Sequence, residues 1–302
     1  MIPRIDAKRM LAGDAETRES LRVAATQTGF AVVYNTAIGA DRIARLMQCY
    51  RDFFHQPEAS KDSINMAKTG ANRGWGAPKS EQVDARANPD YKQVFDCGVT
   101  LPDTDPRRKM GVYAPNLWPK EPADFRAEVE EYFTDACAVA MGVLRGISTA
   151  IGARSDYFDA AFETPMALLR GNYYPARPSW ASARDFGIAE HTDYGCLTLL
   201  ATDGTPGLEV RSIQGEWLPV TAPMGAFVIN FGEMLEIWTN GRVRATPHRV
   251  IGPAQERLSV PLFFNPAHDT NVAPIGSGQV VLAGDHLARR FGETYVHLMQ
   301  AS

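Results

Sequence analysis

The hydrophobic positions in the first half of the chain repeat with the period of an α-helix. Between Ala40 and His55 the apolar residues recur at steps of three and one, which places them along one helix face. From about Pro122 to Ile151 they recur every three or four positions, and proline suits a first helical turn. Gly152 then supplies a helix end. The pattern predicts two amphipathic helices, over residues 40–55 and 122–151.

The period changes to that of β-strands after Met166. Short apolar or β-branched stretches alternate with turn signals such as Asp-Gly, Asn-Gly and Gly-Pro. Strands are predicted over residues 166–174, 197–201, 207–211, 217–220, 226–231, 248–251, 258–265 and 279–282. This spacing predicts an antiparallel sandwich or barrel, of which a double-sheet jelly roll is one solution. Helices first and strands afterwards indicate one compact α+β unit, with a helical region at residues 1–160 and a β core at residues 161–302.

Composition and charge narrow the range of functions. The 302 residues are 45% hydrophobic and 22% charged, with a net charge of −4 and no basic run that would follow a phosphate backbone. The first residues are charged where a secretory signal needs an apolar core, and the run 136–144 is too short to span a bilayer. The four cysteines are scattered. We therefore expect a soluble, cytoplasmic protein with a small-molecule substrate and no nucleic-acid, membrane or obligate protein partner.

Three residues of the β half have the types and the spacing of a metal site. His191 and Asp193 stand at positions i and i+2, which share one face of a strand end. His248 follows 57 positions later at the start of a predicted strand, so a sheet that folds back can return it beside them. Two histidines and one carboxylate occupy three of the six positions of an octahedral coordination sphere. The three open positions are what a non-haem Fe(II) centre needs for its other ligands.

A second pair of polar residues follows shortly after His248. Arg257 and Ser259 again stand at i and i+2, so a guanidinium and a hydroxyl share one face of a strand. Such a pair suits the far carboxylate of a dicarboxylic cosubstrate, because both groups can donate charge-assisted hydrogen bonds to it.

On these motifs the chain resembles the iron(II)- and 2-oxoglutarate-dependent dioxygenases of the isopenicillin N synthase-like branch. The resemblance covers most of the length and includes the helical N-terminal half, with Gly29-Phe30 and Phe95-Asp96. The motifs that carry it in the β half are His191-Thr192-Asp193-Tyr194-Gly195, Gly207-Leu208-Glu209-Val210, Asn230-Phe231-Gly232-Glu233, Thr246-Pro247-His248-Arg249-Val250 and Arg257-Leu258-Ser259.

The resemblance implies a jelly-roll core and a set of site residues. Iron falls on His191, Asp193 and His248, and the 2-oxoglutarate salt bridge falls on Arg257 with Ser259 beside it. The stretch Asn172-Tyr173-Tyr174-Pro175 matches a family motif, so Asn172 and Tyr174 are implied as further cosubstrate contacts.

The activity implied by the same resemblance is oxidation of a C–H bond of a small organic molecule. It uses Fe(II), 2-oxoglutarate and O₂ and releases succinate and CO₂. Hydroxylation is the expected outcome.

Other functions remain open on the sequence. An oxidative cyclase or desaturase of the same branch would work without 2-oxoglutarate and would use Arg257 and Ser259 for a substrate carboxylate. The same ligands could hold Zn²⁺ in a hydrolase or lyase, although no additional acid/base group stands in register. A non-catalytic metal-binding jelly roll is a third possibility, because fold alone does not determine function. A halogenase is disfavoured, since those relatives replace the carboxylate found here at Asp193.

The remaining polar and aromatic candidates have weaker patterns. The stretch 66–120 is rich in Gly, Pro, Asn and Asp and predicts irregular chain with short strands, a kind of segment that often carries function. Candidate pocket residues are Arg73, Trp75, Phe95, Phe263 and Phe264, with core packing as the alternative for the aromatics. The other histidines (His55, His268, His286 and His297) and the cysteines (Cys49, Cys97, Cys137 and Cys196) are predicted to be structural.

Overall fold

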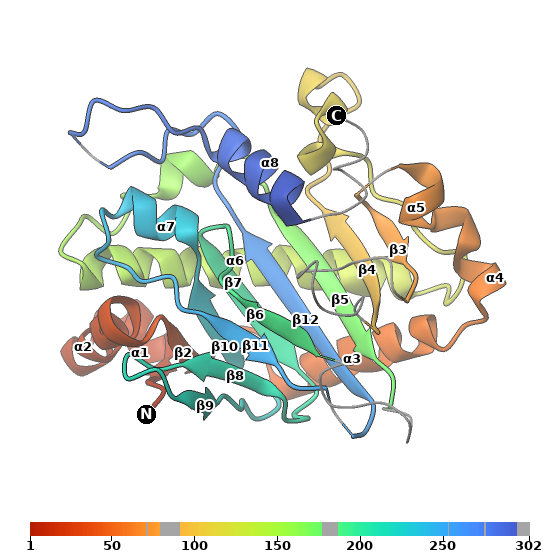
Figure 1. Cartoon of the computed structure of the whole chain (residues 1–302), viewed down its shortest axis with the longest axis horizontal. Helices are drawn as coiled ribbons and strands as arrows, with labels where there is room; N and C mark the ends of the chain where they lie inside the picture. Colours follow the sequence, from red (N-terminus) through yellow and green to blue (C-terminus); the bar gives the residue numbers. More distant parts are fainter. Residues whose placement is uncertain (71, 79–90, 177–186, 253, 275, 295–302) are drawn as a thin grey trace.

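Two β-sheets form the centre of the protein, which is described from a computed structural model (Figure 1). The structure describes residues 1–70, 72–78, 91–176, 187–252, 254–274 and 276–294. The larger sheet has the order β1-β2-β10-β7-β12-β5-β4-β3, and the smaller sheet has the order β6-β11-β8-β9. Among the strands of the described residues, β1 and β2 pair in parallel and the other named pairs are antiparallel.

The strands and helices have the following bounds. The larger sheet contains β1 (Arg4–Asp6), β2 (Phe30–Tyr34), β3 (Gly74–Gly76), β4 (Gln93–Gly98), β5 (Leu168–Tyr174), β7 (Leu197–Thr202), β10 (Phe227–Phe231) and β12 (Arg257–Phe264). The smaller sheet contains β6 (Ile188–His191), β8 (Leu208–Arg211), β9 (Trp217–Pro219) and β11 (His248–Val250). The α-helices are α1 (Ala7–Leu11), α2 (Ala15–Val23), α3 (Ala40–Phe54), α4 (Glu58–Lys61), α5 (Met66–Thr69), α6 (Phe125–Ala150), α7 (Glu233–Trp238) and α8 (Ala283–Thr294).

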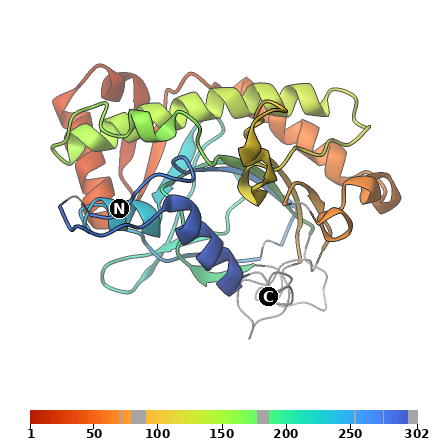
Figure 2. The same cartoon turned by 90° about the horizontal axis from the view of Figure 1, so that it is seen from above.

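The elements lie in layers. Helices α2, α3 and α6 cover one face of the larger sheet, while the smaller sheet and α8 lie on its other side (Figure 2). Two apolar cores correspond to these layers. One lies between the helices and the larger sheet, and the other lies between the two sheets and includes Phe30, Leu200, Val210 and Val228. This arrangement confirms the predicted α+β jelly-roll class with a helical N-terminal region packed on it.

The N-terminal region also contributes strands to the β core. Strand β2 pairs with β10, and β4 pairs with β5, so both ends of the larger sheet are built from residues before 100. The hydrophobic pattern predicted mainly the helices of this region, because the strands are short and β3 and β4 lie within glycine-rich, polar chain.

Most predicted elements are present with small shifts at their ends. Residues 40–55 form α3, and residues 122–151 form α6, which begins at Phe125 instead of Pro122 and is followed by Gly152 at a positive φ of 80°. The strand predicted at 279–282 is wrong. Among the described residues this segment has only an isolated bridge between Leu282 and Asn271, and Val280 is 73% exposed.

Successive side chains of β5 point alternately to the two faces of the larger sheet. One face lies toward the helices, and the other, which we call the inner face, lies toward the smaller sheet. Tyr173 stacks on Phe54 of α3 with ring centroids 5.3 Å apart. Gly171 lies against Tyr50 so closely that a Cβ there would be 2.4 Å from the ring. Side chains at even positions, such as Asn172 and Tyr174, therefore point to the inner face.

We expect Gly171→Ala to destabilise the protein by about 1–3 kcal/mol, because the added methyl group overlaps Tyr50 within a close-packed layer. Gly142→Ala on α6 is the matched control. A Cβ there meets only Leu11 at 3.5 Å, so the helix should gain about 0.5–1 kcal/mol. Urea unfolding of both variants measures the difference, and equal free energies of unfolding would contradict this account of the helix-to-sheet packing.

Candidate active site

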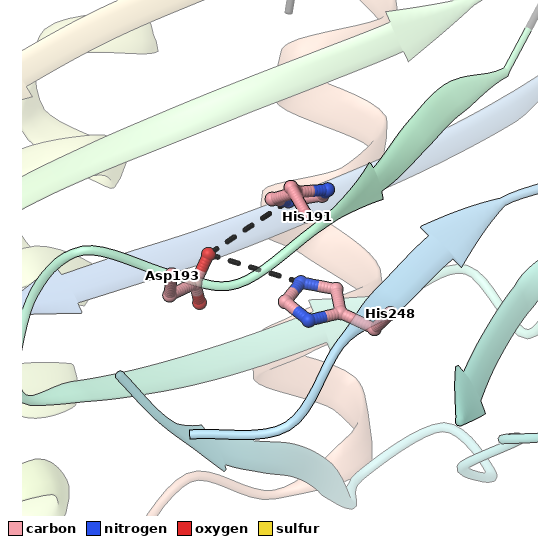
Figure 3. A group of neighbouring side chains, drawn as sticks. All are labelled: His191, Asp193 and His248. Carbon is pink, nitrogen blue, oxygen red and sulfur yellow. Dashed lines mark ion pairs between the residues drawn. The ribbon is translucent and has the colours of Figure 1, made fainter. Parts of the chain in front are cut away.

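The three predicted metal-site residues come together where β6 and β11 pair. His248 is the direct antiparallel partner of His191, so two positions 57 residues apart become neighbours. Asp193 follows the end of β6 and turns back toward both rings (Figure 3). Its Oδ1 lies 3.9 Å from Nε2 of His191 and 3.8 Å from Nε2 of His248. The three ligand atoms all lie within 4.8 Å of one another, a spacing that one ion can bridge.

Hydrogen bonds orient both imidazoles in the same way. Nδ1 of His191 lies 2.9 Å from the carbonyl oxygen of Ala189, and Nδ1 of His248 lies 3.1 Å from that of Thr246. A carbonyl can only accept, so each Nδ1 carries the proton and each Nε2 presents a lone pair. That tautomer is the one a metal ligand needs, and both lone pairs face the same place.

Two side chains hold the carboxylate of Asp193 at its other oxygen. The hydroxyl of Thr198 donates to Oδ2, and Nδ2 of Asn230 donates to the same atom at 2.6 Å. Both donors come from neighbouring strands of the larger sheet, β7 and β10. Oδ1 therefore faces the two imidazoles, in the orientation that a metal-ligating oxygen would have.

Burial and the charges of the neighbouring side chains determine the protonation states of His191 and Asp193. Burial lowers the pKa of His191, and the nearby positive form of His248 lowers it further, while Asp193 opposes both effects. Burial alone would raise the pKa of Asp193, but the two imidazoles and the hydrogen bonds from Thr198 and Asn230 outweigh it, so this pKa lies below its usual value. At neutral pH the group therefore holds a carboxylate beside neutral His191, which is a donor set for a divalent cation.

The N-terminal strand β2 packs directly on one of the imidazoles. The ring of Phe30 meets His248 edge-on with centroids 5.3 Å apart. The preceding Gly29 has a φ of 72°, and a Cβ there would lie 2.0 Å from the Thr246 hydroxyl oxygen. Only glycine allows this approach, which brings β2 against the segment that leads to His248.

Arg257 and Ser259 lie on the inner face of the larger sheet, the face that meets Asp193. Thr198, which bonds to Asp193, is the direct partner of Phe263 on β12. Residues of β12 at odd positions share the face of Phe263, so Arg257 and Ser259 belong to it. Nη1 of Arg257 donates to Oγ of Ser259 at 3.2 Å, as the i and i+2 spacing predicts.

The guanidinium of Arg257 is buried among neutral groups. Its residue is only 2% exposed, and both hydrogen-bond partners found for it in the described part of the chain are neutral oxygens, those of Ser259 and Thr205. A buried positive charge with such surroundings favours an anionic ligand, because the carboxylate would offset the cost of desolvation.

The other two predicted cosubstrate contacts stand beside this pair. Tyr174 is the direct partner of Arg257 across β5 and β12, and its ring centroid lies 5.2 Å from the guanidinium carbon. Asn172 is the direct partner of Ser259 and is 6% exposed. The structure therefore gathers all four residues on adjacent positions of two strands.

Comparison with known proteins agrees with this geometry. Residues 2–121 match the family described as non-haem dioxygenase in morphine synthesis N-terminal, and residues 165–266 match the 2OG-Fe(II) oxygenase superfamily. The 2-oxoglutarate-dependent dioxygenase tropC of Talaromyces stipitatus is 31% identical, over 97% of this chain and 95% of its own length. The chain belongs to the 2OG-Fe(II) oxygenase superfamily.

Other members of the superfamily resemble the chain over nearly its full length. Homoarginine-6-hydroxylase 2-ODD-C23.1 of Arabidopsis thaliana is 30% identical, over 91% of this chain and 87% of its own. The crystal structure of a full-length Neurospora crassa protein in complex with alpha-KG superposes with a TM-score of 0.84 at 28% identity, covering 97% of this chain and 96% of that one. The protein is an Fe(II)- and 2-oxoglutarate-dependent dioxygenase, as predicted.

The residues predicted to line a substrate pocket in this oxygenase lie in surroundings that differ from one residue to the next. Trp75, Phe95 and Phe264 are buried in the core between helices and sheet, so they pack instead of lining a pocket. Phe263 lies on the inner face and is partly exposed. Arg73 is 3% exposed, and its guanidinium donates to two backbone carbonyls, those of Asn72 and Val112.

The histidines and cysteines predicted to be structural behave accordingly where the structure describes them. His55 lies 3.0 Å from Glu256, and His286 lies 2.9 Å from the carbonyl oxygen of Tyr194. Neither these nor His268 joins a metal-binding group among the described residues, and His297 lies outside them. The four cysteines are free, and three of them are buried. None of the helices in the described ranges has the length and apolar character needed to cross a membrane.

Sequence reasoning assigned no role to the two residues that hold Asp193. Asn230 is a polar residue inside β10, where the whole strand is buried, and Thr198 has the same status in β7. The available signal was a polar side chain within a mostly apolar strand. Burying a polar group without a hydrogen-bond partner is costly, so such a side chain indicates a specific partner.

We expect the free energy of unfolding of the metal-free enzyme to decrease as the pH falls below about 6.5. The folded state lowers the pKa of His191, so below the ordinary value of 6.5 the unfolded chain binds a proton that the folded chain does not. One such proton gives a slope of up to about 1.4 kcal/mol per pH unit. Urea unfolding between pH 8 and 5 measures this slope. The His191→Asn variant should show a shallower decrease, and parallel curves would contradict the assignment.

Proposed function

We propose that His191, Asp193 and His248 hold the Fe(II) of this dioxygenase. The observation that carries the proposal is the convergence of two Nε2 lone pairs and Oδ1 of Asp193 on one place. Three ligands on one side leave the opposite positions for other molecules. The carbonyls of Ala189 and Thr246 maintain the ring orientation that this role requires.

We further propose that Arg257 and Ser259 bind the carboxylate of 2-oxoglutarate that lies farther from the metal. Their burial and their common position on the inner face support this role. Tyr174 and Asn172 would complete the contacts from β5. With the cosubstrate held at both ends, its orientation toward the metal is determined by the sheet rather than by a loop.

The reaction we propose is hydroxylation of a C–H bond of a small organic molecule. When bound together, Fe(II) and 2-oxoglutarate activate O₂ for this oxidation, and 2-oxoglutarate leaves as succinate and CO₂. The chain itself contributes orientation of both partners and an apolar environment between the sheets, which keeps water from the reacting groups. Relatives named for homoarginine 6-hydroxylation support hydroxylation as the outcome.

We also propose that residues 1–160 and 161–302 act as one compact unit. Strands β2 and β4 from the first part pair with β10 and β5 of the second, and Phe30 contacts His248. The pocket for the primary substrate would therefore combine elements of both parts.

We expect anaerobic addition of Fe(II) and 2-oxoglutarate to give the visible charge-transfer absorption of their chelate. Asp193→Ala and His248→Ala should abolish this band, because each removes one of the three ligands. Arg211→Ala is the control, since this arginine forms an exposed ion pair with Glu190. Succinate release after admitting O₂ completes the test. An intact band in the Asp193→Ala protein would contradict the ligand assignment.

Arg257→Ala should weaken 2-oxoglutarate binding about 10- to 100-fold while Fe(II) binding is unchanged. The magnitude corresponds to loss of charge-assisted hydrogen bonds of about 1.5–3 kcal/mol. Tyr174→Phe should give a smaller change of the same kind. Titration of each variant with 2-oxoglutarate at saturating Fe(II) measures the dissociation constants. If Arg257→Ala binds the cosubstrate like the wild type, Arg257 does not hold its carboxylate.

A further inference from the structure

The carboxylate of the proposed iron site does not stand on a strand. Strand β6 ends at His191, and Asp193 lies in the turn that connects it to β7. The strand register therefore places the two histidines but not Asp193. Thr198 and Asn230 hold its carboxylate, and contacts made by the turn itself, residues 192–195, determine where its backbone lies.

The backbone of this turn is attached to the start of helix α7. The amide N–H of Glu233 donates to the carbonyl of Asp193 at 2.8 Å, and that of Met234 donates to the carbonyl of Gly195 at 3.1 Å. At Gly232 a Cβ would lie 2.3 Å from the same Gly195 oxygen, so the two segments touch along their backbones. The first residues of α7 and the turn thus form one packed element.

The side chain of Glu233 extends this attachment to the C-terminal helix α8. Its carboxylate accepts a hydrogen bond from the Thr192 hydroxyl. Nη2 of Arg290, on α8, donates to one oxygen of the same carboxylate at 3.0 Å, and its Nε forms an ion-pair contact with the other oxygen at 2.9 Å. The side chains of Glu233 and Arg290 are 24% and 25% exposed, so the pair is largely shielded from solvent.

Two further contacts join α8 to the turn. The guanidinium carbon of Arg290 lies 4.3 Å from the ring centroid of Tyr194. His286, one turn earlier on α8, hydrogen-bonds through Nε2 to the carbonyl oxygen of Tyr194 at 2.9 Å. Helix α8 therefore contacts Tyr194 directly and is linked to Thr192 through Glu233 of α7.

We propose that Glu233 and Arg290 are positioning residues for the iron ligand Asp193, so that docking of α8 is part of the metal site. The inference rests on the proposed ligand set. Neither residue touches the ligand atoms. They act through Thr192 and Tyr194, the two neighbours of Asp193, and hydrogen-bonded groups around metal ligands typically affect metal affinity about 10- to 100-fold.

The test compares Fe(II) dissociation constants of full-length variants under anaerobic conditions, read from the charge-transfer band at saturating 2-oxoglutarate. Glu233→Gln and Arg290→Ala should each weaken Fe(II) binding about tenfold. Their effects should not add in the double variant, because both remove the same link. Glu19→Gln and Arg22→Ala are matched controls on the exposed ion pair of α2 and should leave the affinity unchanged.

If Glu233 and Arg290 had only a structural role, their substitution would lower the stability of the protein without this non-additive loss of Fe(II) affinity. Thr192→Val removes only the hydroxyl that bonds to Glu233, so it should loosen Fe(II) binding while the metal-free protein keeps its melting temperature. Affinity for 2-oxoglutarate at saturating Fe(II) should stay the same in all variants. Folded variants that bind Fe(II) like the wild type would overturn the inference. Equal Fe(II) binding by wild type and Asp193→Ala would instead overturn the proposed ligand set.

Discussion

A carboxylate largely shielded from solvent between two imidazoles is the interaction on which the rest of the structure depends. An unpaired charge is costly inside a protein, so Asp193 needs partners on every side. Thr198 and Asn230 donate to one oxygen, and the other oxygen faces the two rings. These partners come from both sheets, so the pairing of β6 with β11 and of β7 with β10 must be correct before the carboxylate is stabilised. The site and the sandwich are therefore specified together.

Alternation of side chains in the larger sheet separates packing from chemistry. On the face toward the helices, Gly171 and Tyr173 contact α3. On the inner face, the intervening positions carry polar groups such as Asn172 and Arg257. A shift of one residue in the register of β5 or β12 would exchange the two sets, so the helix packing also maintains the positions of the proposed cosubstrate contacts.

The sequence was sufficient for the parts of the molecule that have regular periods or rare motifs. Apolar residues at helical spacing located α3 and α6, and the residue types at 191, 193 and 248 pointed to the three side chains that converge in the proposed metal site. The sequence did not predict α8, because an apolar run before it resembled a strand at 279–282. Nor did it indicate the roles of Asn230 and Thr198, since these depend on which strands become neighbours. Long-range pairing is not encoded in a local pattern.

The edge-on contact of Phe30 with His248 has a consequence for how such a protein can be shortened or recombined. Residues 165–266 match the oxygenase superfamily and contain both histidines, which suggests a transferable module. Yet one wall of the His248 ring comes from a strand more than two hundred positions earlier, seated there through Gly29. A graft of the superfamily segment alone would leave that imidazole bare on one side. The smallest exchangeable piece therefore includes β2, and a chimaera should carry both from the same parent.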